Sequence, residues 1–383
     1  MFEFDEHKIA PAGLRWKLLV HWGALPVITL LVVLLVLPSI SRTGAQVPLV
    51  ADAISAEGSL SAEGSSPAEG SFPVDATFPV DDSFNIDAAF AKARKEYPDI
   101  TVAKVAAAAE LVVKRDVVYR QLGDRELHLD LFYPRPGAEQ DLRPAVLLVH
   151  GGGWRSGNRT LQEPLATYLA NRGFVAATVE YRLSLEARYP AGVQDVKAAL
   201  GWLRDHAGEY GMDPRRVAIV GASSGAQMAT LVGVTPGLDV FETAASAGKD
   251  SVQAIVNLDG VVSFTTPMAL KYENDPRKNP SAAGAWFGGR FEDVPALWRE
   301  ASPLEYAGAG SPPTLFINSS RPRFHAGRDE YIERLAAAGI FSEVMTHDDS
   351  PHPYWLFEPW FSPSAEKATE FLQRTLERAR EQT

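Results

Sequence analysis

The stretch Val217–Ala229, VAIVGASSGAQMA, constrains the fold of this chain more than any other. Its first four residues are apolar and suit a buried strand, and the small residues after Gly225 suit a helix. Between them, the sequence Gly-Ala-Ser-Ser-Gly must turn the chain abruptly, and glycines permit the close backbone approach that such a turn needs. The pattern predicts that the central residue, Ser223, presents its hydroxyl at the end of the strand.

Strand-like and helix-like segments alternate around this turn. Residues 112–120 and 125–134 alternate in polarity about Gly123–Asp124, which predicts a hairpin. Apolar runs of strand length follow, and a helical pattern at 193–207 precedes the serine turn. This order predicts an α/β fold with a mostly parallel, doubly wound sheet. Residues 263–309 interrupt the rhythm with Gly, Pro and Trp, which predicts a small lid insertion.

The N-terminal part divides differently. We expect a cytoplasmic segment at 1–17, an apolar span at 18–40, a low-complexity acidic linker at 41–89 and the folded domain at 90–383. The span has no Asp, Glu, Lys or Arg and is long enough to cross a bilayer, and basic residues precede it. It therefore predicts a membrane anchor with the folded domain exported. A cleaved signal peptide, which would release a secreted protein, and a buried core helix are the alternatives.

Composition excludes several classes of function. The net charge is −11 and no basic stripe is present, so nucleic acid is not an expected partner. The chain has no cysteine, which excludes disulfides, thiol catalysis and cysteine-based zinc sites. No spacing of His, Asp and Glu is diagnostic of a metal, and neither a metal nor a cofactor is expected.

A second glycine-rich turn supports a reactive role for Ser223. Gly151, Gly152 and Gly153 follow an apolar strand and precede Trp154. Backbone NH groups in such a turn, together with the NH of Ser224, can stabilise the negative oxygen of a tetrahedral intermediate. A phosphate-binding loop is the other interpretation, but the Lys and Ser/Thr of the Walker pattern are absent.

The motifs HGGGW, DPRRVAIVGASSG and SPHPYW resemble the α/β-hydrolase family, in particular the branch containing acetylxylan, feruloyl and pectin esterases. The resemblance covers roughly 112–376 and implies the chain order Ser, acid, His, with the histidine after the last strand. His352 fits that place and is the expected general base. His347 lies five residues earlier, at the end of the predicted strand, and is the competitor.

The position of the acidic residue departs from the family pattern. Relatives carry an Asp in the loop after the seventh strand, where this chain has Asn318, Ser319 and Ser320. Asp259, at the end of the preceding strand, is the favoured replacement. Asp329, farther along in a predicted helix, is the alternative acid. A weak or absent acid is the third interpretation.

Aromatic and basic residues gather in the loops expected around the site. Trp154, Arg182, Arg321 and Arg323 are the candidate substrate-binding residues, because aromatic faces stack on sugars and guanidinium groups bind carboxylates. We therefore expect a serine carboxylesterase that deacylates carbohydrate esters of the xylan or pectin type. The alternatives are a lipase or small-ester esterase of the same fold and a tethered binding protein without activity.

Overall fold

The computed structural model describes residues 81–135 and 142–381. The expected anchor at 18–40 and the expected linker up to residue 80 lie outside these residues. Within the described residues, no helix is both long and apolar enough to span a membrane.

The core of the domain is an eight-stranded sheet with the order β2-β3-β5-β4-β6-β7-β8-β9. β2 pairs antiparallel with β3 and β3 with β5, and every other neighbouring pair is parallel. The predicted hairpin and mostly parallel sheet are therefore confirmed. The strands are β2 (Leu111–Leu122), β3 (Arg125–Pro134), β4 (Arg143–Val149), β5 (Val175–Val179), β6 (Met212–Ala222), β7 (Ala254–Leu258), β8 (Thr314–Asn318) and β9 (Ser342–Thr346).

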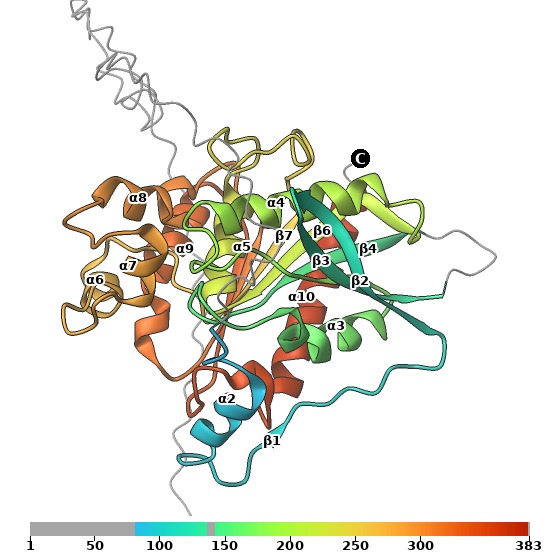
Figure 1. The fold of residues 1–383 in the computed structure, drawn as a ribbon. Coiled ribbons are helices and arrows are strands. Elements are labelled where there is room, and N and C mark those ends of the chain that lie inside the picture. The colour runs from blue at the N-terminus through green and yellow to red at the C-terminus, as the bar shows by residue number, and fades with distance from the viewer. Residues whose placement is uncertain (1–80, 136–141, 382–383) are drawn as a thin grey trace, which may run out of the picture. The chain divides into compact units, whose positions relative to one another are not determined.

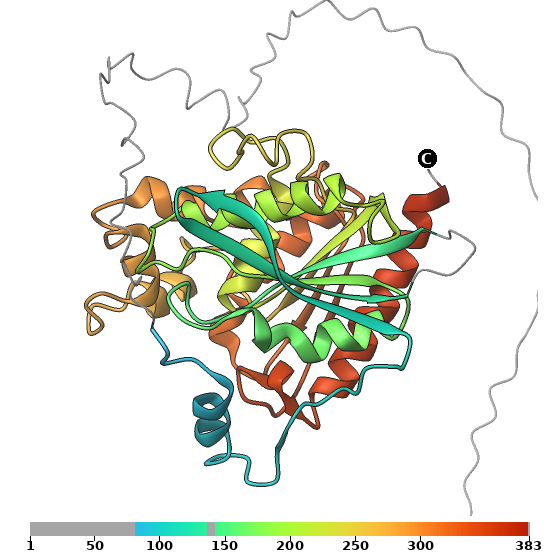
Figure 2. The ribbon, with the colours of Figure 1, turned by 45° about the vertical axis from the view of Figure 1, so that its right-hand side comes forward.

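Helices cover both faces of the sheet (Figures 1 and 2). α4 (Ala191–Asp205), α5 (Ser224–Val234) and α9 (Arg328–Ala337) contribute to one hydrophobic core. α3 (Glu163–Ala170) and α10 (Phe361–Glu381) contribute to the other. Alternate residues of β4 enter the two cores, Leu147 the first and Leu148 the second, so the strand is apolar throughout. This is why the central strands are continuous apolar runs in the sequence.

The insertion at 263–309 folds into α6 (Pro267–Glu273), α7 (Ala282–Phe287), α8 (Pro295–Glu300) and the short helix η2 (Pro303–Tyr306). Its Trp286 and Trp298 are fully buried and pack with Phe287. Burying these tryptophans supplies the apolar area that fixes the insertion to the sheet.

Ordered structure begins before the expected boundary at residue 90. Asp81 forms a parallel bridge with Ser156, and α2 (Ile86–Ala93) is capped by Asn85, whose side chain accepts a hydrogen bond from the Ala88 NH. β1 (Thr101–Val102) then pairs with β10 (Phe357–Glu358). Burial of Ala89 and Ala93 in the second core explains why the end of the acidic segment folds.

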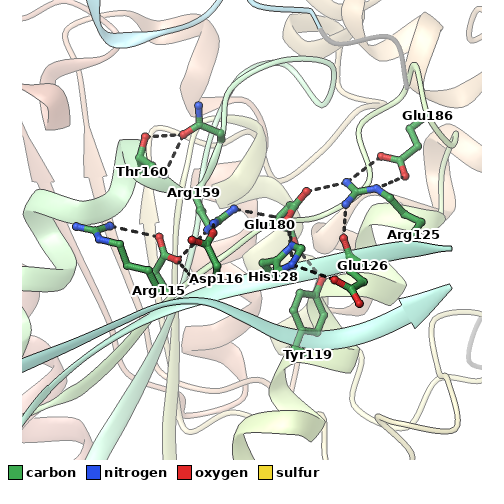
Figure 3. Close-up of polar contacts among 12 residues, drawn as sticks. Arg115, Asp116, Tyr119, Arg125, Glu126, His128, Arg159, Thr160, Glu180 and Glu186 are labelled. Atoms are coloured by element: carbon green, nitrogen blue, oxygen red, sulfur yellow. Dashed lines mark hydrogen bonds and ion pairs between the residues drawn. The ribbon is translucent and has the colours of Figure 1, made fainter. Parts of the chain in front are cut away.

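A charged network ties the β2–β3 hairpin to the chain after the glycine turn (Figure 3). The buried Asp130 carboxylate accepts the Asp116 NH at 2.9 Å and lies 3.0 Å from Arg159 Nε. Arg159 opens the short helix η1 (Arg159–Gln162). Glu180, just after β5, pairs with Arg125 at 2.7 Å. The Arg159–Asp130 pair thus joins the exit of the glycine turn to β3, and the Arg125–Glu180 pair joins β3 to the end of β5.

The contact between α5 and the end of β4 allows no side chain at Gly225. A Cβ atom there would lie 2.3 Å from the carbonyl oxygens of both Val149 and His150. We expect Gly225→Ala to lower the free energy of unfolding by about 3 kcal/mol, because the backbone must move apart. Chemical denaturation measures this, and Gly308→Ala is the control, since a Cβ at Gly308 meets nothing within 4 Å. Equal stability of the two variants would contradict the close contact.

Candidate active site

Ser223 occupies the turn between β6 and α5 in a strained conformation. Its φ of 53° and ψ of −122° are rare for a residue with a side chain. The Ser223 NH donates to the Leu258 carbonyl oxygen at 2.8 Å, which fixes the turn. A Cβ at Gly221 would lie 2.2 Å from the Gly225 carbonyl oxygen, so both glycines are needed for this geometry.

His352 reaches Ser223 from the loop after β9. Its Nε2 lies 2.8 Å from Ser223 Oγ. The imidazole stacks on the ring of Phe324, with 3.3 Å between ring centroids, and meets Trp355 edge-on at 5.1 Å. These two aromatic contacts hold the imidazole plane in place.

Asp259 completes the chain of hydrogen bonds. It follows β7 directly, is fully buried, and its Oδ2 lies 2.6 Å from His352 Nδ1. Its other oxygen, Oδ1, accepts from the Ser319 NH at 2.9 Å and from the Asn318 amide at 3.3 Å. Asn318 and Ser319, which occupy the place of the acidic residue in the family pattern, therefore orient Asp259 at the end of the neighbouring strand. Such an arrangement holds one histidine tautomer and stabilises the imidazolium.

The two competitors bond elsewhere. Asp329, in the first turn of α9, is exposed and pairs with Arg328 at 2.8 Å. His347 Nε2 lies 2.8 Å from Ser364 Oγ. The structure gives neither of them a contact with Ser223 or His352, and the alternative acid is therefore wrong as a member of this hydrogen-bonded chain.

The glycine turn lies directly against Ser223. A Cβ at Gly151 would be 3.0 Å from Ser223 Cβ and 2.7 Å from the Ala222 carbonyl oxygen. Gly152 and Gly153 have φ values of 137° and 63°, and both line a cavity with Ser223. In the part of the chain that the structure describes, neither donates its NH to another backbone group. The Ser224 NH opens α5, where NH groups have no acceptor within the helix.

His150 precedes the glycines and has a supporting role. It is buried, its Nδ1 lies 2.9 Å from the Gly151 carbonyl oxygen, and its ring stacks on Tyr181. The Tyr181 hydroxyl donates to the His150 carbonyl oxygen at 2.9 Å. Burial lowers the pKa of His150 to about 4, so the ring is neutral at physiological pH.

Two cavities of unequal size meet at Ser223. The larger has a volume of about 750 Å³ and includes His352 and its neighbours Pro351 and Pro353. The smaller has a volume of about 100 Å³ and includes Ser224. Its remaining lining residues are Gly153, Trp154, Asp259, Val261, Glu273, Ala282, Arg323 and Phe324.

The four candidate substrate-binding residues have different surroundings. Trp154 is 5% exposed, donates to Gln227 at 2.9 Å and stacks on Trp286, so it supports the small cavity from within the core. Arg182 pairs with the buried Asp195 at 2.9 Å and lines neither cavity. The prediction of Arg182 as a substrate-binding residue is wrong, because its ion pair with the buried Asp195 carboxylate holds its side chain away from the site.

The other two arginines line the larger cavity but are already paired. Arg321 bonds Glu96, and Arg323 bonds Glu273 at 2.9 Å. Sequence reasoning missed the part of the lining that α2 and the residues just before and after it supply. The helix-capping Asn85 and the spacing of Ile86, Ala89 and Ala93 were the available signal. Among the described residues, no cluster of three or more His, Asp or Glu could hold a metal ion.

The buried His150 makes stability depend on pH. Below pH 6.5 the unfolded chain binds a proton that the folded ring does not accept until about pH 4. Stability is therefore present above this window and is lost as the pH falls through it, by about 3 kcal/mol for a shift of this size. We expect His150→Asn to lose less stability than the native chain between pH 7 and pH 4, as measured by denaturation at each pH. Equal losses of stability in the native chain and in His150→Asn would contradict this expectation.

Comparison with known proteins gives a consistent family. The BD-FAE family model matches residues 129–324, just over half of the chain. A probable carboxylic ester hydrolase, LipM, of Mycobacterium tuberculosis is 29% identical over 248 residues, which are 62% of this chain and 53% of that protein. The carboxylesterase NlhH of the same organism is 29% identical over 247 residues, 61% of this chain and 73% of that protein.

Solved structures share the fold at low identity. A truncated carbohydrate esterase from gut microbiota aligns with a TM-score of 0.58 and 21% identity, over 71% of this chain and all of that one. A butyrate-bound esterase of Thermogutta terrifontis aligns with a TM-score of 0.56 and 24% identity, over 70% of this chain and 94% of that one.

The relatives above are carboxylic ester hydrolases and esterases. The chain spans about half the length of the first curated relatives that it matches. The fold, the serine turn and the family match agree. The chain belongs to the BD-FAE family and has an α/β-hydrolase fold.

Proposed function

We propose that the protein is a serine carboxylesterase that removes short acyl groups from carbohydrate esters. One observation carries the proposal: the hydrogen-bonded chain Ser223–His352–Asp259 ends at a hydroxyl that opens to both cavities. A nucleophile, a base and an orienting carboxylate in this geometry are the requirements for acyl transfer through a covalent intermediate.

In the proposed reaction each group has a defined role. Ser223 Oγ attacks the ester carbonyl carbon while His352 Nε2 takes the hydroxyl proton. The NH groups of Ser224 and of the Gly151–Gly153 turn stabilise the negative oxygen. The intermediate expels the alcohol, which receives the proton from His352, and leaves an acyl-serine. Water, deprotonated by His352, then attacks the acyl carbon, releases the acid and returns the proton to Ser223.

The two cavities separate the two halves of the ester. His352 must reach the leaving oxygen, and it lines only the larger cavity, which therefore takes the alcohol. The acyl chain extends from the oxyanion site into the smaller cavity of about 100 Å³. A cavity of roughly 150 Å³ holds one benzene molecule. The smaller cavity thus favours acetyl and similarly short groups over aromatic or long aliphatic ones.

The alcohol cavity supports a carbohydrate. Its volume of about 750 Å³ is within the range of roughly 300–1,000 Å³ for small-molecule sites. Its lining combines aromatic rings with hydroxyl and charged groups, which suits the apolar faces and hydroxyl rims of sugars. The similarity to a gut carbohydrate esterase agrees with this choice. A xylan or pectin type of ester is the form we propose.

The other interpretations have less support. A small-ester esterase keeps the same short acyl cavity, and the butyrate-bound structural neighbour favours it as the second candidate. A lipase for long chains does not fit a cavity of about 100 Å³. A binding protein without activity was motivated by a missing acid, and Asp259 now stands 2.6 Å from His352. Membrane anchoring through residues 18–40, with the domain exported, stays part of the proposal.

The acid is tested by matched substitutions. We expect Ser223→Ala and Asp259→Asn each to lower kcat on 4-nitrophenyl acetate by about 10⁴-fold or more, because the nucleophile or the histidine tautomer is lost. Asp329→Asn is the control and keeps kcat within about twofold, since its carboxylate is exposed. Loss of activity in Asp329→Asn with retention in Asp259→Asn would reverse the assignment.

The substrate class is tested by acid release. The native chain should release acetate from acetylated xylan and acetylated pectin, and Ser223→Ala should not. On 4-nitrophenyl esters, kcat/KM should fall by about tenfold or more from acetate to decanoate, because the decanoyl chain exceeds the small cavity. Turnover of decanoyl esters while both polymers remain intact would contradict the carbohydrate assignment.

The small cavity offers a matched control for the acyl preference. Val261 lines only this cavity and is 5% exposed, whereas Val240 is 39% exposed and lines neither cavity. We expect Val261→Ala to raise the butyrate-to-acetate ratio of kcat/KM several-fold, and Val240→Ala to leave it unchanged. An unchanged ratio in Val261→Ala would remove the smaller cavity from the acyl site.

A further inference from the structure

One wall of the larger cavity comes from the segment Asp81–Tyr97, which precedes the matched family region at 129–324. On α2 and just after it, the cavity-lining residues recur with the spacing of one helix face. The segment's lining residues are Ser83, Phe84, Ala88, Ala89, Lys92, Ala93 and Glu96. The alcohol site is therefore completed by a part of the chain outside the matched region.

The segment is attached at both ends to the loops that carry the active site. At its start, Asp81 Oδ2 accepts from Arg155 Nε at 2.5 Å and Asp81 bridges to Ser156, immediately after the glycine turn. The Arg155 side chain is 40% exposed and its partner Asp81 13% exposed, so this pair is partly shielded from solvent. This end fixes the wall beside the oxyanion groups.

At its other end, the segment contacts the loops around the acid and the base. Glu96 pairs with Arg321, which follows the residues that hold Asp259. The Tyr97 hydroxyl donates to Asp349 at 2.8 Å, and its ring meets Trp360 edge-on at 5.0 Å. Asp349 lies three residues before His352. The segment is thus attached to the loops on which the proposed catalytic groups lie.

The composition of the wall fits a sugar chain. Ala88 is exposed and presents an apolar surface to the cavity, the nearly buried Ala89 and Ala93 add only their small uncovered area, and Phe84 adds an aromatic ring. Tyr272 from α6 and Phe324 line the same cavity. Lys92 is exposed and, in the part of the chain that the structure describes, has no carboxylate partner, so its ammonium group can donate to sugar hydroxyls.

We propose that the segment Asp81–Tyr97 is the element that selects the alcohol, with Phe84 and the Ala88 face of α2 as its main contact surface for an oligosaccharide. The inference rests on the proposed esterase function, since it names the partner of the leaving oxygen. It assigns specificity to a region that contributes nothing to the reacting groups.

The experiment compares two acetate esters on the full chain. Acetylated xylotriose needs the wall, whereas 4-nitrophenyl acetate is small enough to react without it. Ala88→Trp fills the cavity from an exposed helix position, and Phe84→Ala removes the aromatic surface. We expect each variant to lower the ratio of kcat/KM for the oligosaccharide to that for the small ester by about tenfold. Ala91→Trp, exposed on the same helix but outside the cavity lining, should leave the ratio unchanged.

The other outcomes of this experiment contradict either the proposed subsite or the proposed function. An unchanged ratio in Ala88→Trp and Phe84→Ala overturns the proposal, whether the two rates stay constant or fall together. If the native chain hydrolyses the small ester alone, the esterase stands and the oligosaccharide subsite fails. If it hydrolyses neither ester, the proposed function fails. In that case, calorimetric measurement of xylotriose binding tests the subsite. The proposed subsite requires a Kd about tenfold weaker in Ala88→Trp than in Ala91→Trp.

Discussion

The close contact between the serine turn and the glycine turn is the constraint on which the rest of the site depends. The first turn of α5 lies so close to the carbonyl oxygens at the end of β4 that no Cβ atom fits at Gly225. No Cβ atom fits at Gly221 either, because the Gly225 carbonyl oxygen is too close. This contact forces Ser223 into its strained conformation and brings Gly151 against it. Backbone packing thus fixes the proposed nucleophile and the proposed oxyanion donors before any substrate arrives, as electrostatic preorganisation requires.

The remaining groups reach this point from separate strand ends. Asp259 follows β7, its supporting Asn318 and Ser319 end or follow β8, and His352 comes from the loop after β9. Because parallel strands end at one edge of the sheet, short loops suffice to assemble the set. The salt bridges around the cavity then have a structural role: Arg155, Arg321 and Arg323 each hold a wall segment through a carboxylate.

Local signals predicted the parts of the site that depend on local geometry. The glycine spacing around Ser223 and the run Gly151–Gly153 can be recognised because the backbone itself demands those residues. His352 and Asp259 were identified through the family resemblance, which implied the chain order Ser, acid, His. The partners Asn318 and Ser319 of Asp259 could not be found, because their role depends on a neighbouring strand some 60 residues away.

Tertiary partners explain the expectations that the structure corrects. Arg182 looked like a cation on the rim, but the buried Asp195 takes it. Trp154 looked like a stacking surface, but the insertion's Trp286 covers it. Residues 81–89 were expected to be the end of the linker, but they begin a helix whose buried residues are alanines. In each case the deciding contact comes from a distant part of the chain.

The central claim is that His352 and Asp259 activate Ser223, and covalent labelling tests it most directly. A fluorophosphonate, which reacts with activated serines, is incubated with the full chain, and the adduct is located by mass spectrometry. We expect one adduct, on Ser223, and labelling slowed by at least about 10³-fold in His352→Asn. A folded protein that stays unlabelled, or one labelled at another serine, would contradict it.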